Sequence, residues 1–195
     1  TGPNLNDCMV DVGYYRAETP VAPVLRNNVW TGSTKLRING PTDLAGVSGN
    51  DAAGTNTDAG EIYVYKGATD LRDTTDLSGL RRIYAFGGYY YDARLVIHGQ
   101  PNLNGLTIGG NPSFFTPVEG NGVVAGVHLD RSNVQAATGD LEVRDSTSTN
   151  TSFTATTGHT LLIQGSALTT SGVGAFTHGS ANFLDSRLNE TPVGV

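Results

Sequence analysis

The sequence predicts an all-β protein whose C-terminal part is a right-handed parallel β-helix, and two observations lead to this fold class. First, residues 95–188 form short apolar segments separated by Gly, Ser, Thr, Asn and Asp, a pattern typical of many short strands. A coil of such strands, stacked on the next coil at about 4.8 Å, buries its inward side chains in a continuous column. Second, apolar residues recur every 20 residues, at Tyr63, Ile83, Leu103, Val123, Val143, Ile163 and Phe183. An antiparallel β-sandwich or jelly roll is the alternative, because its short strands produce a similar pattern.

Residues 1–30 are expected to form an extended, irregular N-terminal arm. Three prolines fix φ and lack backbone donors, so this segment is unsuited to the middle of a sheet. Its apolar residues still need cover, either on their own domain or on a neighbouring subunit. The arm residues that we expect at an interface are Val21, Val24, Leu25 and Trp30.

Residues 31–94 are expected to form a β-rich N-terminal part. Leu36 and Ile38 alternate with Lys35 and Arg37, which predicts a half-buried strand over 34–38. A long Gly-rich loop follows over 40–61, and loops of this length are usually functional or disordered. Further strands are predicted over 62–65 and 80–86.

Residues 95–195 are expected to form the body of the protein, either β-helical or sandwich-like. A strand over 93–98 leads into it. The segment over 161–188, LLIQGSALTTSGVGAFTHGSANFLDSRL, resembles a coil and a half of a right-handed parallel β-helix. Its apolar groups are separated by turn-forming Gly, Ser, Asn or Asp residues.

Composition and charge exclude several classes of function. Twelve basic and 18 acidic residues give a formal charge of −6, whereas nucleic-acid binding needs a concentrated basic face. The single cysteine, Cys8, excludes an internal disulfide and a cysteine-based metal cluster. No apolar run is long enough to span a bilayer. We therefore expect neither a nucleic-acid partner nor a membrane span.

Residues with catalytic or metal-binding chemistry are few and scattered. Nucleophile-elbow, phosphate-loop and zinc motifs are absent, and the four histidines lack metal-ligand spacing. The sequence therefore favours a protein without enzymatic activity and without a cofactor. Under the 20-residue spacing Asp145 and Asp185 share a phase two coils apart, which permits an inverting carboxylate pair with Arg187 nearby. A calcium ion is the one cofactor whose ligand types occur together, and the candidates are Asp51, Asn56, Asp58 and Glu61.

The turn-and-strand texture of residues 95–188, the Pro-rich arm and the hydroxyl-rich, lysine-poor composition resemble virion surface proteins of tailed phages. Tail-spike or fibre segments and capsid decoration proteins both fit. The resemblance implies a non-enzymatic structural protein, extracellular or in the virion, that assembles, stabilises or attaches to a host surface. It also implies a homotrimer, with other virion or surface proteins and a surface glycan as further partners. A trimer interface would cover the aromatic residues Tyr89, Tyr90, Tyr91, Phe114 and Phe115.

Two alternatives belong to other functional classes. One is a polysaccharide-degrading β-helix enzyme that uses Asp145 and Asp185. The other is a surface adhesin or filament subunit whose N-terminal arm completes the sheet of a neighbour by strand addition.

Overall fold

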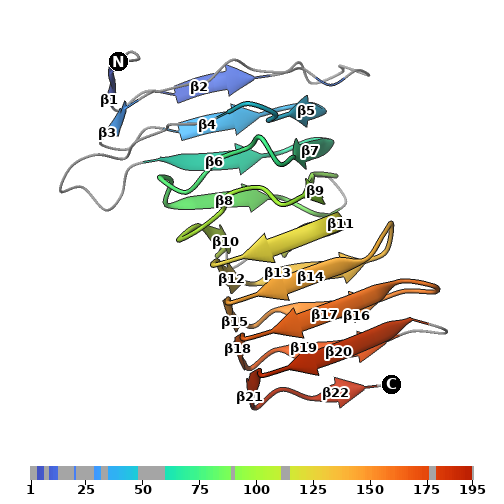
Figure 1. Ribbon diagram of the computed structural model, residues 1–195. Coiled ribbons are helices and arrows are strands. Elements are labelled where there is room, and N and C mark those ends of the chain that lie inside the picture. Colours follow the sequence, from blue (N-terminus) through green and yellow to red (C-terminus); the bar gives the residue numbers. More distant parts are fainter. Residues whose placement is uncertain are drawn as a thin grey trace.

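The computed structural model describes residues 4–6, 9–12, 20, 29–31, 35–47, 60–88, 91–110, 115–175 and 179–194. All regular structure in these residues is β-strand. None of the described residues forms a helix capable of crossing a membrane. The strands are stacked in two parallel sheets that wind into a solenoid (Figure 1).

Sheet I contains nine strands, one from each successive rung of the solenoid. In stacking order they are β2 (Met9–Val12), β4 (Lys35–Ile38), β6 (Glu61–Val64), β8 (Arg82–Ala85), β10 (Thr107–Gly109), β12 (His128–Asp130), β15 (Thr147–Thr149), β18 (Ala167–Thr169) and β21 (Arg187–Asn189).

Sheet II contains eleven strands. They are β5 (Thr42–Asp43), β7 (Ala68–Leu71), β9 (Arg94–Gly99), β11 (Thr116–Ala125), β13 (Ser132–Ala136), β14 (Leu141–Arg144), β16 (Ser152–Ala155), β17 (Thr160–Gln164), β19 (Gly172–Ala175), β20 (Ser180–Leu184) and β22 (Val193–Gly194). A separate pair, β1 (Asn4–Asn6) with β3 (Val29–Thr31), lies near the N-terminus (Figure 1).

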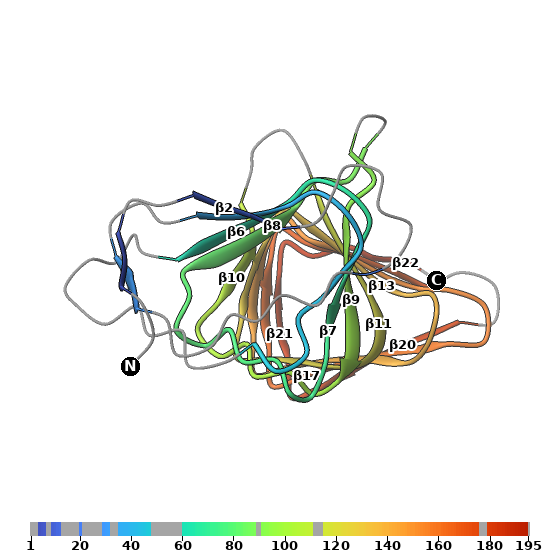
Figure 2. The same cartoon turned by 90° about the horizontal axis from the view of Figure 1, so that it is seen from above.

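The long strand β11 joins two branches of sheet II. Its first part pairs with β13, its last part pairs with β14, and its middle pairs with β9. From this point on each rung has three strands, for example β15, β16 and β17. Seen along the axis, the rungs surround one interior (Figure 2). The predicted parallel β-helix-like fold is confirmed, and the sandwich alternative is wrong because every ladder between the named strands is parallel.

The solenoid begins earlier in the chain than the sequence predicts. Strand β2 pairs with β4 and β4 with β6, so much of the region before residue 95 already belongs to the stack. The described part of the predicted arm is therefore extended, with β2 at the edge of sheet I. Strand β5 lies inside the predicted loop over 40–61, and β7 was not predicted.

The 20-residue repeat is correct only near the C-terminus. Val143, Ile163 and Phe183 are register partners, and so are Leu141, Leu161 and Ala181. Upstream the spacing differs from rung to rung, because the connections vary in length. Ile83 pairs with Ile62 rather than Tyr63, and Val123 pairs with Glu142, so the upstream members of the predicted series do not form one column.

The core is a set of inward columns, one residue from each rung. In sheet I the column Leu36, Ile62, Ile83, Ile108, Leu129, Ser148 and Leu168 is at most 3% exposed. Its last member, Leu188, is 40% exposed. Alternation within each strand directs every second side chain to this interior, so even three-residue strands contribute to the core.

Two corners of each C-terminal rung contain a residue with positive φ followed by Ser or Thr. Asp145 and Asp185 adopt φ near 50°, and Ser146 and Ser186 follow them. Gly165 occupies the same corner in the rung between, followed by Ser166. The second corner has Asn150, Thr170 and Glu190, each followed by a hydroxyl residue. Left-handed residues turn the chain sharply, which allows short strands to close a rung.

The corner hydroxyls form ladders along the solenoid axis. The Ser166 hydroxyl donates to the Gln164 carbonyl at 2.9 Å and accepts from the Ser146 N–H at 3.1 Å. The Ser166 N–H in turn donates to the Ser186 hydroxyl at 3.3 Å. Each hydroxyl therefore satisfies backbone groups that a turn leaves unpaired, which buried corners require.

An aromatic cluster covers the outer side of sheet I. Tyr65 and Phe86 stack with ring centroids 4.9 Å apart, and Tyr91 contacts both rings at 5.8 Å. Tyr63 packs on Tyr84 at 4.9 Å. Because Tyr63 and Tyr84 are register partners on adjacent rungs and the other rings pack beside them, the cluster stabilises the stack from outside.

Candidate functional site

Charged and polar side chains gather around a groove of about 420 Å³ on the outer face of sheet II. The groove crosses neighbouring rungs, because β7, β9 and β11 are consecutive partners in the sheet. Val96 and Gly120 lie among the polar groups and have no polar side-chain atoms. The polar residues that line it are Asp70, Arg72, Arg94, His98, Glu119, Asn121 and Thr138.

The strand register arranges these side chains in columns. Asp43, Asp70, Val96 and Glu119 are successive partners across four rungs, on the face opposite the buried column. His98 and Asn121 are partners in the neighbouring outward column. A column whose successive side chains lie about 4.8 Å apart brings distant parts of the sequence within reach of one ligand.

Ion pairs fix the positions of the groove side chains. The Arg72 guanidinium donates to Asp43 at 2.8 Å and to Asp70 at 3.0 Å, so it bridges two rungs. The other oxygen of Asp70 lies 3.3 Å from His98 Nε2. Arg94 Nε lies 2.7 Å from Glu119 Oε1. The charges of these groups are largely balanced within the groove.

These contacts affect the ionisation of Arg72. Its hydrogen bond to Asp43 raises the pKa of the guanidinium above its ordinary value, and the nearby Asp70 carboxylate acts in the same direction. Arg72 is therefore a permanent cation that holds both carboxylates in place. Because its side chain is 41% exposed, solvent screens this attraction and the stability gain is small.

Gly120, in β11, shapes the far side of the groove. Gly120 has a φ of +132°, and a Cβ atom there would lie 2.1 Å from the Ile97 carbonyl oxygen. Glycine is required because the two backbones approach too closely for any side chain. Asn121 follows Gly120 and is exposed. A Cβ atom on Gly139, in the β13–β14 connection, would meet the Asn121 side chain.

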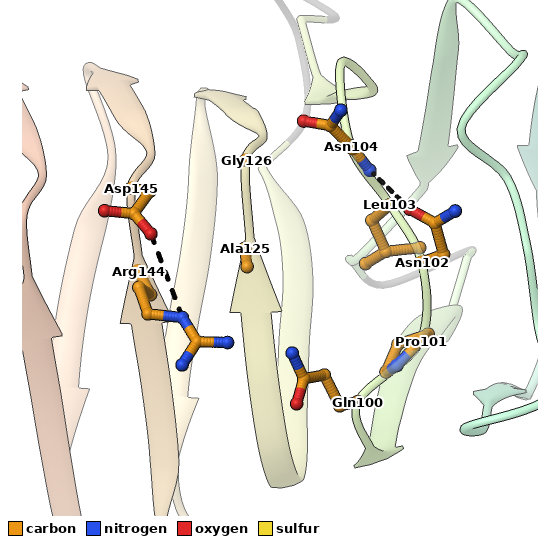
Figure 3. Close-up of a pocket in the computed structure, with 9 residues that line it drawn as sticks. All are labelled: Gln100, Pro101, Asn102, Leu103, Asn104, Ala125, Gly126, Arg144 and Asp145. Carbon is orange, nitrogen blue, oxygen red and sulfur yellow. Dashed lines mark hydrogen bonds and ion pairs between the residues drawn. The ribbon is translucent and has the colours of Figure 1, made fainter.

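A second groove, of about 480 Å³, contains the predicted residue Asp145 (Figure 3). Arg144 and Asp145 lie on one side, with 3.9 Å between Arg144 Nε and Asp145 Oδ2. Asn102 and Asn104 lie on the other side, and the Asn104 N–H donates to the Asn102 side-chain oxygen at 3.4 Å. Between the two sides are Ala125 and Gly126, whose small size leaves the space open.

The predicted acids lie at a corner of the solenoid. Asp145, Gly165 and Asp185 follow the register partners Arg144, Gln164 and Leu184, so the two acids do share a phase two rungs apart. Both adopt a left-handed backbone conformation and are exposed. Arg187 follows in β21 and lines a smaller depression with Asn189. Their catalytic role stays a prediction.

The calcium candidates are mostly outside the described residues. Three of them, Asp51, Asn56 and Asp58, lie outside the described residues. Glu61 lies in β6, where its carboxylate is within 4 Å of three cations, Lys35, Arg81 and Arg82, and accepts a hydrogen bond from Tyr63. Burial and this hydrogen bond raise the pKa of Tyr63 well above its ordinary value of 10.0. No group of three or more acidic, histidine or cysteine side chains suited to a metal occurs in the described part of the chain.

The predicted interface residues differ in their surroundings. Phe115 is 54% exposed, and Tyr91 packs within its own chain against Tyr65 and Phe86. Trp30 lies in β3, but its side chain lies outside the described residues. The remaining candidates also lie outside them, namely Val21, Val24, Leu25, Tyr89, Tyr90 and Phe114.

The chain was compared with protein-family models, curated proteins and solved structures. None of them matches it. The candidate site therefore rests on geometry alone.

The groove on sheet II was not predicted from the sequence. A weak signal was present, because Asp70 and Arg72 alternate with Thr69 and Leu71, as expected for a half-buried strand. The residues of one column are 27, 26 and 23 positions apart, at Asp43, Asp70, Val96 and Glu119. No constant period aligns them.

Proposed function

We propose that this chain is a structural protein of an extracellular particle surface, of the tailed-phage virion type, that attaches to a neutral surface glycan. The groove on sheet II is the attachment site. Chemical activity is not required for this role, since the side chains act by positioning hydrogen bonds.

The observation that carries the proposal is the set of groups around this groove. Asp70 and Glu119 offer acceptors, Arg72 and Arg94 offer donors, and Asn121 offers both. Each sugar hydroxyl both donates and accepts a hydrogen bond. Neighbouring hydroxyls therefore match carboxylate acceptors and guanidinium donors that lie side by side. The ion pairs hold the groups in place before a ligand arrives, which lowers the entropic cost of binding.

Charge selects the class of glycan. Carboxylates and guanidinium groups balance within the groove, whereas the whole chain has a formal charge of −6. A strongly anionic polysaccharide would be repelled at long range. A neutral polysaccharide fits both conditions.

The solenoid itself supports a structural role. Each rung is paired to its neighbours along parallel ladders, and the corner hydroxyls pair the backbone groups at the turns. A stack of this kind is stiff because neighbouring rungs share continuous hydrogen bonding. Stiffness suits display on a particle.

Binding to a glycan array carrying neutral and acidic bacterial polysaccharides tests the proposal. The variant pair His98→Ala with Asn121→Ala removes two polar groups of the groove. The pair His128→Ala with Asn182→Ala removes the same side-chain types from the outer faces of β12 and β20. We expect the groove variant to bind about 5- to 150-fold more weakly, since two lost hydrogen bonds are worth about 1–3 kcal/mol. Binding of the control variant should equal that of the wild type.

Absence of binding to every polysaccharide would overturn the proposal, as would equal affinities of the two double variants. The expected homotrimer is tested separately by light scattering at micromolar concentration. A monodisperse monomer would contradict the trimer.

Polysaccharide hydrolysis is a second candidate function, and one observation favours it. Asp70 and Glu119 share a column two rungs apart, which corresponds to about 9.6 Å between their Cα atoms. An inverting glycosidase needs about 6.5–9.5 Å between its two carboxyl groups. The corner pair Asp145 and Asp185 has the same two-rung separation.

Release of reducing ends from the array polysaccharides measures this activity. If a groove pair is catalytic, Asp70→Asn or Glu119→Gln abolishes the release. If the corner pair is catalytic, Asp145→Asn or Asp185→Asn does so. Release that none of the four substitutions changes would eliminate this candidate.

A further inference from the structure

The two grooves adjoin along the same strands. His98 lines the groove on sheet II and Gln100 lines the corner groove, with only Gly99 between them in the chain. On the next rung, Asn121 belongs to the first groove and Ala125 to the second. The two depressions therefore lie next to each other at the end of β9 and along β11.

The junction between the grooves contains two glycines. Gly99 and Gly122 are register partners, so two glycines are stacked at this point of the surface. Close contacts require glycine at both positions. A Cβ atom on Gly122 would lie 2.1 Å from the Gly99 carbonyl oxygen, and a Cβ atom on Gly99, which has a φ of +72°, would meet the Asp73 side chain. The side chains near the junction are therefore Asp73, beside Gly99, and Val123, between Asn121 and Ala125 in β11.

The corner groove has the same chemical character as the first. Asn102 and Asn104 supply amide groups, and Arg144 is balanced by Asp145 at 3.9 Å and by Glu142 at 3.8 Å. The volumes, about 420 and 480 Å³, each lie within the range of about 300–1,000 Å³ typical of ligand sites.

We propose that the two grooves form one elongated site for a linear neutral polysaccharide, which crosses the glycine junction from Asp70 to Asp145. This inference rests on the proposed glycan-binding function and adds the length and path of the ligand. The first groove holds one part of the polysaccharide and the corner groove holds the next.

Titration calorimetry with oligosaccharides of increasing length tests this inference. The probes are a disaccharide, a tetrasaccharide and an octasaccharide, cut by partial acid hydrolysis from the polysaccharide that binds most tightly on the array. For a continuous site we expect the affinity to rise with length. We also expect one octasaccharide to bind per protein chain.

Paired variants locate the second half of the site. Asn104→Ala with Arg144→Ala alters the corner groove, and Asn182→Ala with Arg37→Ala removes the same side-chain types elsewhere. The corner variant should weaken octasaccharide binding at least tenfold and leave disaccharide binding unchanged. The control should change neither. Circular dichroism establishes that both variants are folded.

The outcomes separate this inference from the proposed function. If the wild type binds no polysaccharide on the array, the proposed function fails. If the disaccharide binds as tightly as the octasaccharide, or two octasaccharides bind per chain, only the continuous site is overturned. Equal loss of octasaccharide binding in the corner variant and the control would also overturn it.

Discussion

Removal of one corner hydroxyl tests whether the ladders stabilise the solenoid. Ser166 is 3% exposed, and its hydroxyl connects two rungs. The substitution Ser166→Ala leaves the Ser146 N–H without its partner, in a residue that is only 4% exposed. The Gln164 carbonyl is less affected, since it also accepts from the Asp145 N–H at 3.0 Å.

The expected cost follows from that single orphaned donor. A buried polar group without a partner costs about 1–3 kcal/mol, so the free energy of unfolding should fall by this amount. Urea titration followed by circular dichroism measures it. The midpoint should shift while the slope stays unchanged, because the surface exposed on unfolding is nearly the same.

Ser180→Ala is the matched control. Its hydroxyl donates to Thr160 Oγ1 at 3.2 Å, but the residue is exposed and water can replace the partner. The control should change stability by less than about 0.5 kcal/mol. If Ser166→Ala were as stable as Ser180→Ala, the hydroxyl ladders would not contribute as described.

Three further predictions concern the fold. Gly120→Ala should prevent correct folding, judged by soluble yield, because its Cβ would lie 2.1 Å from the Ile97 carbonyl oxygen. Gly158 has open space around it, so Gly158→Ala should lower the free energy of unfolding by only about 1–2 kcal/mol, the cost of its positive φ. Phe153→Ala should cost about 3–5 kcal/mol in a urea titration, since the ring is fully buried, and Phe115→Ala less than about 0.5 kcal/mol; similar values would contradict the assigned core. Because the folded state raises the pKa of Tyr63, its contribution to stability is complete below pH 10.0 and is lost as pH rises further, so the alkaline loss of stability should be smaller in Tyr63→Phe than in the wild type.

Particular elements show how far the sequence determines the fold. Alternation over 35–38 predicts the strand β4 and its buried face, because every second side chain must be apolar there. The 20-residue spacing predicts the register of β14, β17 and β20, where the rungs have equal length. Upstream, loops of different length separate the rungs. Apolar residues of successive rungs then align in space, although their spacing along the sequence is not constant.

The sequence by itself predicted an all-β chain of short strands separated by turns, since strand alternation and turn residues are local properties. It also predicted that Asp145 and Asp185 share a phase two coils apart. The choice between a parallel β-helix and an antiparallel sandwich came from the tertiary structure. Only the tertiary structure decided that Asp70, His98 and Glu119 gather in one groove and that a second groove lies beside it. The physical reason is that rung register depends on connection lengths and on close backbone packing, and neither has a local signature in the sequence.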